Sequence, residues 1–536
     1  MIARFRALPE PARCLFVRLA NRRRSLFRSS RLNYPEIPAL SQALTVLEAA
    51  DLVTRQTEQL LTDQLGWLDA FTRTELLQLF SDQVISRRLS KAELLEHIPR
   101  HFDSSHIVQT LTDYDPVLLL TVVPELQVLK FLFFGSLNRD MEQFVLRDLG
   151  QVQFETLDTH LVPAYFLNRQ HVQDCLAVRQ AYQQFLLLSE RLPAAALAQW
   201  FETWQQQHQK LHPDAERVLA RLTVRVGQVL ERAGLITAAL ACYAQCELPP
   251  ARERRIRLLQ RSQRSAEALA LCETILASPG HGGERIFAED FRNAIRAGQT
   301  RRAVTRYLKT APQLVLPDAL QKRLPRVEQA VLRHFQERGW QGHFAENLPW
   351  RALLGLLLWD VLFDARRGGF MNPLQRGPTD LWSPDFYLQH QQGIDQILSS
   401  WCTQKQRWPC LEQKMRAKWG IANPLVVWVP ELPELLRQLV IRLQGAQLQA
   451  ILQDILSNVR DQAHGFPDLM LWRDDEYQLL EVKSPTDRLS DQQLYWLCRF
   501  EQLDICAGII RIKWAATAEK GEGMLLSDTK ETGENQ

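Results

Sequence analysis

Two carboxylates and a lysine near the C-terminal end of the chain have types and a spacing that suit phosphodiester hydrolysis. Asp468 follows a proline, twelve residues separate it from Glu481, and Lys483 stands two positions after Glu481. A phosphodiester is negatively charged and repels an attacking hydroxide. Its hydrolysis therefore needs acidic side chains that can hold a metal ion and a cationic side chain beside them.

The segments around these residues predict a β-hairpin. Residues 469–472 and 477–483 are short apolar stretches, and four polar residues join them, which is typical of two antiparallel strands. Because side chains alternate along a strand, Glu481 and Lys483 project to one face of the hairpin. Asp468 lies at the start of the first strand, so we expect it beside Glu481.

Burying two carboxylates with one lysine is unfavourable unless a cation or water shares the site. Mg²⁺ or Mn²⁺ would meet that need with carboxylate oxygens, and the carbonyl of Val482 could add a ligand. The metal would neutralise the phosphate and acidify a bound water. Lys483 would orient that water and stabilise the developing charge. The alternative is a surface hairpin on which Glu481 and Lys483 form a solvated pair.

Other metal chemistries have no support in the chain. It has no HExxH motif and no pair of CxxC motifs, which argues against a metalloprotease and a zinc finger. His464 precedes Asp468 by four residues, and a single histidine is more often structural or a phosphate contact than a metal ligand. Nine cysteines without a framework are typical of a reducing compartment.

The bulk properties place any DNA-binding surface in local clusters of charge, because the net charge of the 536 residues is only +3. No apolar run is long enough to cross a membrane. Residues 1–33 are rich in arginine and are expected to form a basic arm that lies on nucleic acid, with a targeting segment as the alternative.

The body of the chain is predicted to be helical. Residues 34–212 form an expected helical DNA-binding region, in which residues 66–102 resemble a SAP-type unit of two helices with a basic connector. Ser90 begins the second helix of this unit with a capping box. Three basic residues at the connector are candidate DNA contacts: Arg87, Arg88 and Lys91. The alternative is an ordinary helical hairpin with a solvated charge run.

Residues 213–335 show short helices with a tetratricopeptide-like pattern. Arginines cluster in this region, and three of them are candidate contacts to a phosphate backbone: Arg252, Arg254 and Arg255. A helix surface whose arginines pair with acidic side chains explains the cluster equally well. Residues 336–514 form the expected nuclease domain, and residues 515–536 are polar and aperiodic, which predicts a disordered tail.

The C-terminal motifs also resemble a known family. GFPDL, LLEVKSP and DRLSDQQLYWL follow one another as in the VRR-NUC form of the PD-(D/E)XK nuclease domain. The wider chain is similar to bacterial-type members of the Fanconi-associated nuclease family, through FLFFGSLNRDMEQFVLRDLG, PPARERRIRLL, ENLPWRALLGLLLWDVLF and NPLQRGPTDL. The resemblance covers most of the chain beyond about residue 34. It implies a mainly helical fold with a C-terminal α/β nuclease domain.

The resemblance implies roles for individual residues. Asp468, Glu481 and Lys483 match the metal-binding and catalytic positions. Glu346 matches an upstream glutamate that adds a metal-binding carboxylate, although the residue alone would be read as an acid at a helix N-terminus. Gln493 matches a glutamine at the active site, while the sequence around it also predicts a capping box.

Two further positions bear on the resemblance. Gln375 matches a glutamine that precedes the PxDL motif and whose role is open. Gln492 stands where some relatives have lysine, so one phosphate contact is expected to be missing. Ser484 replaces a glycine that follows the lysine in many relatives, without an expected consequence.

The implied activity is metal-dependent cutting of 5′ flaps or branched DNA and trimming from the 5′ end, in repair of interstrand crosslinks. The expected location is the bacterial cytoplasm, at the nucleoid, with no membrane partner. No ubiquitin-binding zinc finger is visible, and the residues do not indicate an oligomeric state. The alternatives are a nuclease of the same fold for other branched DNA, such as four-way junctions, and an inactive DNA-binding scaffold.

Overall fold

The computed structural model describes residues 1–515 apart from residues 23–24, 38, 56–63, 81–87, 138–141, 159 and 299–302. Almost all of the expected tail, residues 516–536, and the candidate Arg87 lie outside the described residues. The described chain is mainly helical, with a three-stranded and a five-stranded sheet, which confirms the expected fold class. It divides into two compact units, residues 1–149 and 150–536.

The first unit begins with folded helices where the sequence predicted a basic arm. Helices α1 (Ile2–Arg6) and α2 (Glu10–Ala20) carry the first arginines. Four apolar residues at helical spacing bury one face of α2 in the core of this unit: Ala12, Leu15, Phe16 and Leu19. The expectation of an arm was wrong because apolar residues with a 3.6-residue period lie between the arginines and give α2 a face that packs in the core.

The predicted SAP-like unit contains two capped helices. Thr72 begins α5 (Arg73–Leu79) and Ser90 begins α6 (Lys91–His101), each through a complete capping box. The cap at Thr72 separates α5 from α4 (Gln64–Asp69). Arg88 is exposed, and the Lys91 ammonium lies 2.9 Å from a carboxylate oxygen of Asp69. DNA contact by Arg88 and Lys91 stays a prediction.

The rest of the first unit surrounds a small antiparallel sheet of order β1-β3-β2. A buried ion cluster joins β1 to the helices, because Arg28 bonds Glu75 at 2.8 Å and Asp115 at 2.8 Å. The remaining elements are β1 (Leu26–Arg28), η1 (Ser29–Arg31), α3 (Leu40–Ala49), β2 (Val53–Thr54), α7 (Ser104–Tyr114), β3 (Val117–Leu120), α8 (Val123–Phe134) and α9 (Glu142–Asp148).

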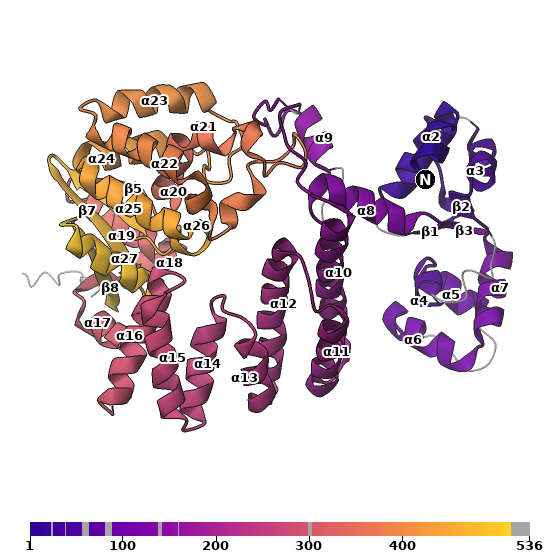
Figure 1. Ribbon diagram of the computed structural model, residues 1–536, viewed down its shortest axis with the longest axis horizontal. Helices are drawn as coiled ribbons and strands as arrows, with labels where there is room; N and C mark the ends of the chain where they lie inside the picture. The colour runs from indigo at the N-terminus through magenta and orange to yellow at the C-terminus, as the bar shows by residue number, and fades with distance from the viewer. Residues whose placement is uncertain are drawn as a thin grey trace, which may run out of the picture. The chain divides into compact units, whose positions relative to one another are not determined.

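The second unit starts with a row of helices. Helices α12 to α16 pack one against the next in chain order, as Figure 1 shows. This order fits the tetratricopeptide-like pattern, whose units stack on their neighbours. The row comprises α10 (Arg169–Arg191), α11 (Ala194–Gln207), α12 (Pro213–Arg232), α13 (Ile236–Ala244), α14 (Ala251–Arg261), α15 (Ser265–Ala277), α16 (Gly282–Arg296) and α17 (Ala303–Thr310).

A five-stranded sheet of order β4-β8-β7-β6-β5 forms the centre of the nuclease domain. Strands β6 (Leu469–Arg473) and β7 (Glu476–Lys483) are the predicted hairpin, with Leu469 opposite Leu480. Strand β8 (Ala507–Ala515) runs parallel to β7 and to β4 (Gln313–Pro317), and β5 (Gln341–Phe344) closes the other edge. Since β4 belongs to this sheet, the domain starts before the expected boundary at residue 336.

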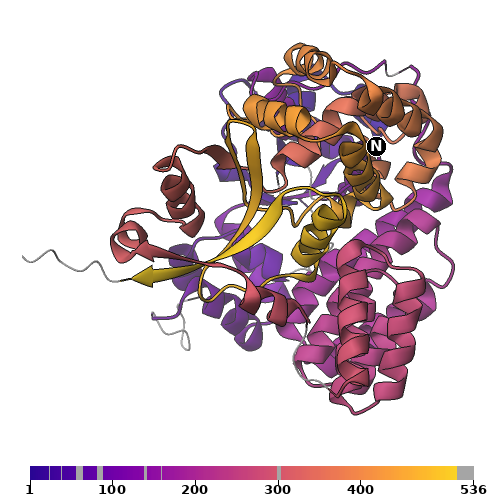
Figure 2. The same ribbon diagram turned by 90° about the vertical axis from the view of Figure 1, so that its left-hand side faces the viewer.

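Helices cover both faces of the sheet, as Figure 2 shows. Helices α18 (Asp318–Arg323) and α19 (Val327–Gln336) pack on the face formed by Leu480 and Val482. Helix α27 (Asp491–Gln502) packs on the opposite face, beside Ile509. Side chains of β7 that point towards α27 therefore include Glu481 and Lys483, because they alternate with Leu480 and Val482.

The residues that lie between β5 and β6 in the sequence form a large helical layer. This layer contains the largest apolar core among the described residues. Its helices supply the residues on which α27 and the hairpin rest. They are α20 (Leu348–Leu357), α21 (Trp359–Leu362), η3 (Ala365–Arg367), η4 (Thr379–Trp382), α22 (Phe386–Thr403), α23 (Arg407–Lys418), α24 (Leu432–Arg442), α25 (Gly445–Ser457) and α26 (Val459–Gln462). Among the described residues, no helix combines the length and apolarity needed to cross a bilayer.

Candidate active site

The hairpin places Asp468 against the backbone of β7. A carboxylate oxygen of Asp468 accepts a hydrogen bond of 2.8 Å from the Val482 N–H. The turn of the hairpin is tight, and Asp474 takes the left-handed conformation there with φ of 50°. This closure confirms that the two strands pair, and it brings Asp468 next to the segment that carries Glu481 and Lys483.

Glu346 joins this group from the end of β5. The backbone N–H groups of Ala345 and Glu346 both donate to the Asp468 carbonyl, at 2.8 and 3.3 Å. Glu346 is one of the few described non-glycine residues with a positive φ, 40°. A glutamate in this conformation is held there by its surroundings at a cost of about 1–3 kcal/mol, and such strain is common at functional sites.

Glu481, Lys483 and Gln493 form a closed polar triangle on the α27 side of the sheet. The Lys483 ammonium lies 2.7 Å from Oε1 of Glu481, and the Gln493 amide donates to the same oxygen at 2.5 Å. The Lys483 ammonium also donates to Oε1 of Gln493 at 3.1 Å. Gln493 accepts in addition from the Ser490 N–H at 3.0 Å, so it serves the helix cap and the triangle together.

The second oxygen of Glu481 has no hydrogen-bond partner among the described residues, although it is buried. Burial raises the pKa of Glu481 to about 8, and the charge of Asp468 adds to this effect. Burial also raises the pKa of Asp468 to about 6, with further contributions from the charges of Glu328 and Glu346. Two neighbouring carboxylates with raised pKa values, one of them with a buried oxygen that has no partner among the described residues, form an environment that a hard divalent cation stabilises, so these residues fit such a metal.

Glu328 is an acidic residue whose charge acts on Asp468 and which sequence reasoning missed. It is the second residue of α19, and its charge is one of the causes of the raised Asp468 pKa. The sequence placed this helix in the repeat region, 140 positions before Asp468. The sequence pattern that could have identified Glu328 is an amphipathic helix that directly precedes a short strand. That strand, β5, belongs to the same sheet as the hairpin.

Gln492 forms a link between α27 and the helical row. Its amide oxygen accepts from the Gly283 N–H at 2.8 Å, and its amide nitrogen donates to Gln462 at 2.7 Å. A Cβ atom at Gly283 would come within 2.7 Å of the Gln492 side-chain oxygen and 3.1 Å of the Gln492 backbone nitrogen, so a larger residue there would displace the Gln492 amide. The glutamine that replaces an expected lysine is therefore buried and satisfied within the protein.

The arginine cluster of the helical row is largely paired within the protein. Arg252 is 6% exposed and forms a buried bidentate pair with Glu284, at 2.9 and 2.5 Å. Its assignment as a surface DNA contact was wrong, because a partner 32 positions away removes it from the surface. Arg254 lies 2.9 Å from Glu231, and Arg255 lies 4.0 Å from Glu247. DNA contact by Arg254 and Arg255 stays a prediction.

Gln375 is also structural. Its side chain accepts from the backbone N–H groups of Met371 and Asn372 and donates to the carbonyls of Gly369 and Gly377. These four bonds fix the loop that carries the NPLQRGP motif. No described contact connects Gln375 with the carboxylate group.

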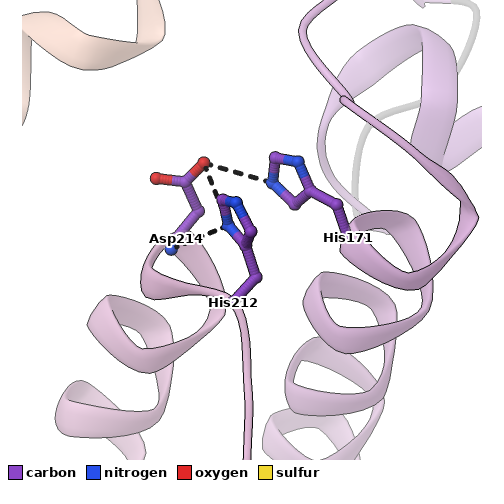
Figure 3. A group of neighbouring side chains, drawn as sticks. All are labelled: His171, His212 and Asp214. Carbon is purple, nitrogen blue, oxygen red and sulfur yellow. Dashed lines mark hydrogen bonds and ion pairs between the residues drawn. The ribbon is translucent and has the colours of Figure 1, made fainter.

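A second group of metal-type side chains lies at the start of α10 and α12 (Figure 3). His171 and His212 stack with ring centroids 3.5 Å apart, and Nε2 of His171 lies 3.2 Å from Oδ2 of Asp214. However, Nδ1 of His171 accepts the Leu167 N–H, and Nδ1 of His212 accepts the Asp214 N–H, both at 3.3 Å. The neutral rings therefore carry their protons on Nε2. This state suits hydrogen bonding and helix capping, and metal binding would require the group to rearrange.

Comparison with known proteins agrees with this geometry. Residues 404–514 match the VRR-NUC domain, and residues 1–54 match the domain described as "FAN1, HTH domain". The second match covers the whole segment that was expected to be a basic arm, so that expectation is corrected on this ground as well.

Relatives and solved structures extend the match over nearly the whole chain. A Fanconi-associated nuclease 1 homolog of Pseudomonas aeruginosa is 30% identical over 523 residues, which is 95% of this chain and 90% of that protein. The homolog of Arabidopsis thaliana is 25% identical over 92% of this chain and 62% of its own length. The crystal structure of paFAN1 bound to 2nt 5′flap DNA with gap is 28% identical, with a TM-score of 0.83 over 96% of this chain and 93% of that chain. The chain belongs to the Fanconi-associated nuclease family and is a DNA nuclease.

Proposed function

We propose that the protein cuts 5′ flaps and related branched DNA with a divalent metal ion and trims DNA from the 5′ end. The observation that supports the site most strongly is the buried, unpartnered oxygen of Glu481 next to Asp468. The paFAN1 structures contain 5′ flap DNA, and their overall similarity supports the same substrate class for this chain.

In this proposal Mg²⁺ or Mn²⁺ is held by the carboxylates of Asp468 and Glu481, the carbonyl of Val482 and the carboxylate of Glu346. The bound metal supplies positive charge to the phosphate and makes a water molecule more acidic. The protein's own contribution is to hold these oxygens in a closely packed place, because α27 and the sheet exclude most water from Glu481, which is 1% exposed.

Lys483 and Gln493 have distinct parts in the proposed mechanism. The Lys483 ammonium stands at the same face as the carboxylates, where it can orient the attacking water and stabilise charge on the phosphate oxygens. Gln493 fixes both Lys483 and Glu481 through its amide, at 3.1 and 2.5 Å. Because Gln493 is also part of the cap at Ser490, the position of the amide is set by the start of α27.

Selectivity for branched DNA would follow from the energy needed to bend the DNA and not from contacts to its bases. Interrupted DNA bends at a lower free-energy cost than a continuous duplex. Repair of DNA interstrand crosslinks, in the bacterial cytoplasm at the nucleoid, is the process we assign to this activity. Both proposals rest on the family resemblance.

Cleavage of an end-labelled 5′-flap duplex with Mg²⁺ or Mn²⁺ tests this function. Asp468→Ala should abolish the cutting, whereas Asp475→Ala, an exposed aspartate in the turn of the same hairpin, should leave it unchanged. A four-way junction of the same sequences serves as the competing substrate. Faster cutting of that junction than of the flap would overturn the substrate assignment, and equal cutting by Asp468→Ala would overturn the site.

A further inference from the structure

A basic cavity of about 810 Å³ opens next to the candidate active site. It lies between α14, α17, the edge strand β4, its neighbour β8, and the loop that follows Lys483. Five basic side chains and one acidic side chain line it. The basic residues are Arg257, Lys309, Arg488, Arg511 and Lys513, and the acidic residue is Asp487.

The strand register places this cavity on the catalytic face of the sheet. Lys483 on β7 pairs with Arg511 on the parallel strand β8. Partners in register point to the same face, and Lys513 follows Arg511 by two positions on that face. The face that begins with Glu481 and Lys483 therefore continues across β8 as Arg511 and Lys513.

The positive charge of the cavity is available to a ligand. Lys309, Arg488 and Lys513 are exposed and form no ion pair with the carboxylates of the described residues. Asp487 is already engaged, because it accepts the Ser484 N–H at 2.8 Å and so shapes the loop. Arg511 is held in place by a hydrogen bond of 3.0 Å to the Ala311 carbonyl.

We propose that this cavity binds the phosphodiester backbone of a short single-stranded segment of the DNA strand that is cut. The inference rests on the proposed function and adds a binding site to it. The volume is within the roughly 300–1,000 Å³ of pockets for small ligands, which admits a few nucleotides of single strand but no duplex. None of the described lining residues is aromatic, so the contact is electrostatic and independent of base sequence.

The test is binding of fluorescent (dT)4, followed by anisotropy in EDTA, where no cleavage occurs. Lys309→Glu/Lys513→Glu should weaken binding at least tenfold. The matched variant Lys309→Gln/Lys513→Gln should reduce the slope of log Kd against log salt by about 1.4, because each lost contact to single strands removes about 0.7. Lys405→Glu reverses the charge of an exposed residue outside the cavity. It should change neither the Kd for (dT)4 nor the salt slope by more than twofold.

Cleavage of the 5′-flap duplex gives a second reading with the same variants. The charge-reversed variant should show a raised KM and a kcat within about twofold of the wild type. Unchanged (dT)4 binding in that variant, absent binding by the wild type, or an equal loss in Lys405→Glu would each overturn the proposal. If (dT)4 binding behaves as expected but the wild type cuts no DNA, the proposed function fails, and the cavity stands as a binding site for single-stranded DNA without its link to a cut strand.

Discussion

The carboxylate group at Asp468 and Glu481 and the histidine group at His171 and His212 contain residue types that bind metals, but their hydrogen bonds differ. Glu481 keeps a buried oxygen without a partner among the described residues. In the histidine group, both Nδ1 atoms accept backbone N–H groups, so Nε2 of His171, which is buried without a hydrogen-bond partner among the described residues, carries a proton and faces Oδ2 of Asp214 at 3.2 Å. Residue types alone would favour the histidines for a transition metal. The hydrogen bonds favour the carboxylates. A metal site is therefore recognised by buried acceptor atoms that have no hydrogen-bond partner within the protein.

The largest effect expected from this comparison is on catalysis. Asp468→Ala should reduce metal-dependent cleavage at least about a hundredfold, as expected for loss of one charge-stabilising group. His171→Ala should retain activity within about threefold. Single-turnover cleavage rates measure both, with the melting temperature as a control for folding. A comparable loss of rate in a folded His171→Ala protein would remove the distinction between the two groups.

Gln493 should have the next largest effect. Gln493→Ala removes the bonds to Lys483 and Glu481 as well as the helix cap, and should lower kcat by about ten- to a hundredfold. Ser490→Ala removes only the cap and should cost about 1 kcal/mol of unfolding free energy with little change in kcat. Chemical denaturation and cleavage rates separate the two roles. Equal kcat values in these variants would reduce Gln493 to a capping residue.

Metal binding at the carboxylates should depend on pH. Because burial raises the pKa of Asp468 to about 6 and of Glu481 to about 8, protons compete with the metal below pH 8. Mn²⁺ affinity should therefore rise between pH 6 and pH 8.5, which calorimetry can follow. A Mn²⁺ affinity that stays constant over this pH range would show that Glu481 does not release a proton when the metal binds.

The same pKa shift predicts the stability of the metal-free protein. A carboxyl whose pKa is raised on folding contributes stability at low pH, and this contribution is lost as pH rises through the folded value near 8. At pH 8.5, Glu481→Gln should therefore be more stable than the metal-free wild type by on the order of 1–4 kcal/mol. Urea denaturation at pH 5 and pH 8.5 checks this difference, which should shrink at the lower pH.

The smallest expected effect concerns the binding of Zn²⁺ to the histidine group. In an Asp468→Ala background, Zn²⁺ should not bind stoichiometrically to the histidine group, because its Nε2 atoms carry protons. Dialysis against one equivalent of Zn²⁺, followed by metal analysis, gives the answer. Retention of one zinc that is lost in His171→Ala would contradict our description of these hydrogen bonds.

The hairpin and its three functional residues could be predicted because they are local. Alternation along a strand fixes the faces of Glu481 and Lys483, and sixteen consecutive positions contain the whole motif from Asp468 to Lys483. The family resemblance supplied Glu346 and Gln493, which no spacing rule connects with Asp468. Their places in the structure depend on β5 and α27, which are distant or separate elements.

The errors arose where a distant partner decides the outcome. Arg252 looks like its neighbours in the sequence, but Glu284 on another helix takes it into the core. Glu328 looks like a surface helix residue, but α19 packs on the sheet of the hairpin. The apolar residues of α2 show that arginine-rich composition does not exclude a core face. Contacts of this kind join residues that are far apart in the sequence. Local periodicity therefore does not predict them.

Location of the bound cation tests the central claim most directly. Crystals of the protein soaked with Mn²⁺ should show anomalous scattering between Asp468 and Glu481, within about 2.0–2.4 Å of their carboxylate oxygens. Glu481→Gln should weaken that signal, and none should occur at His171 and His212. A Mn²⁺ signal at the histidines with none at the carboxylates would contradict the account.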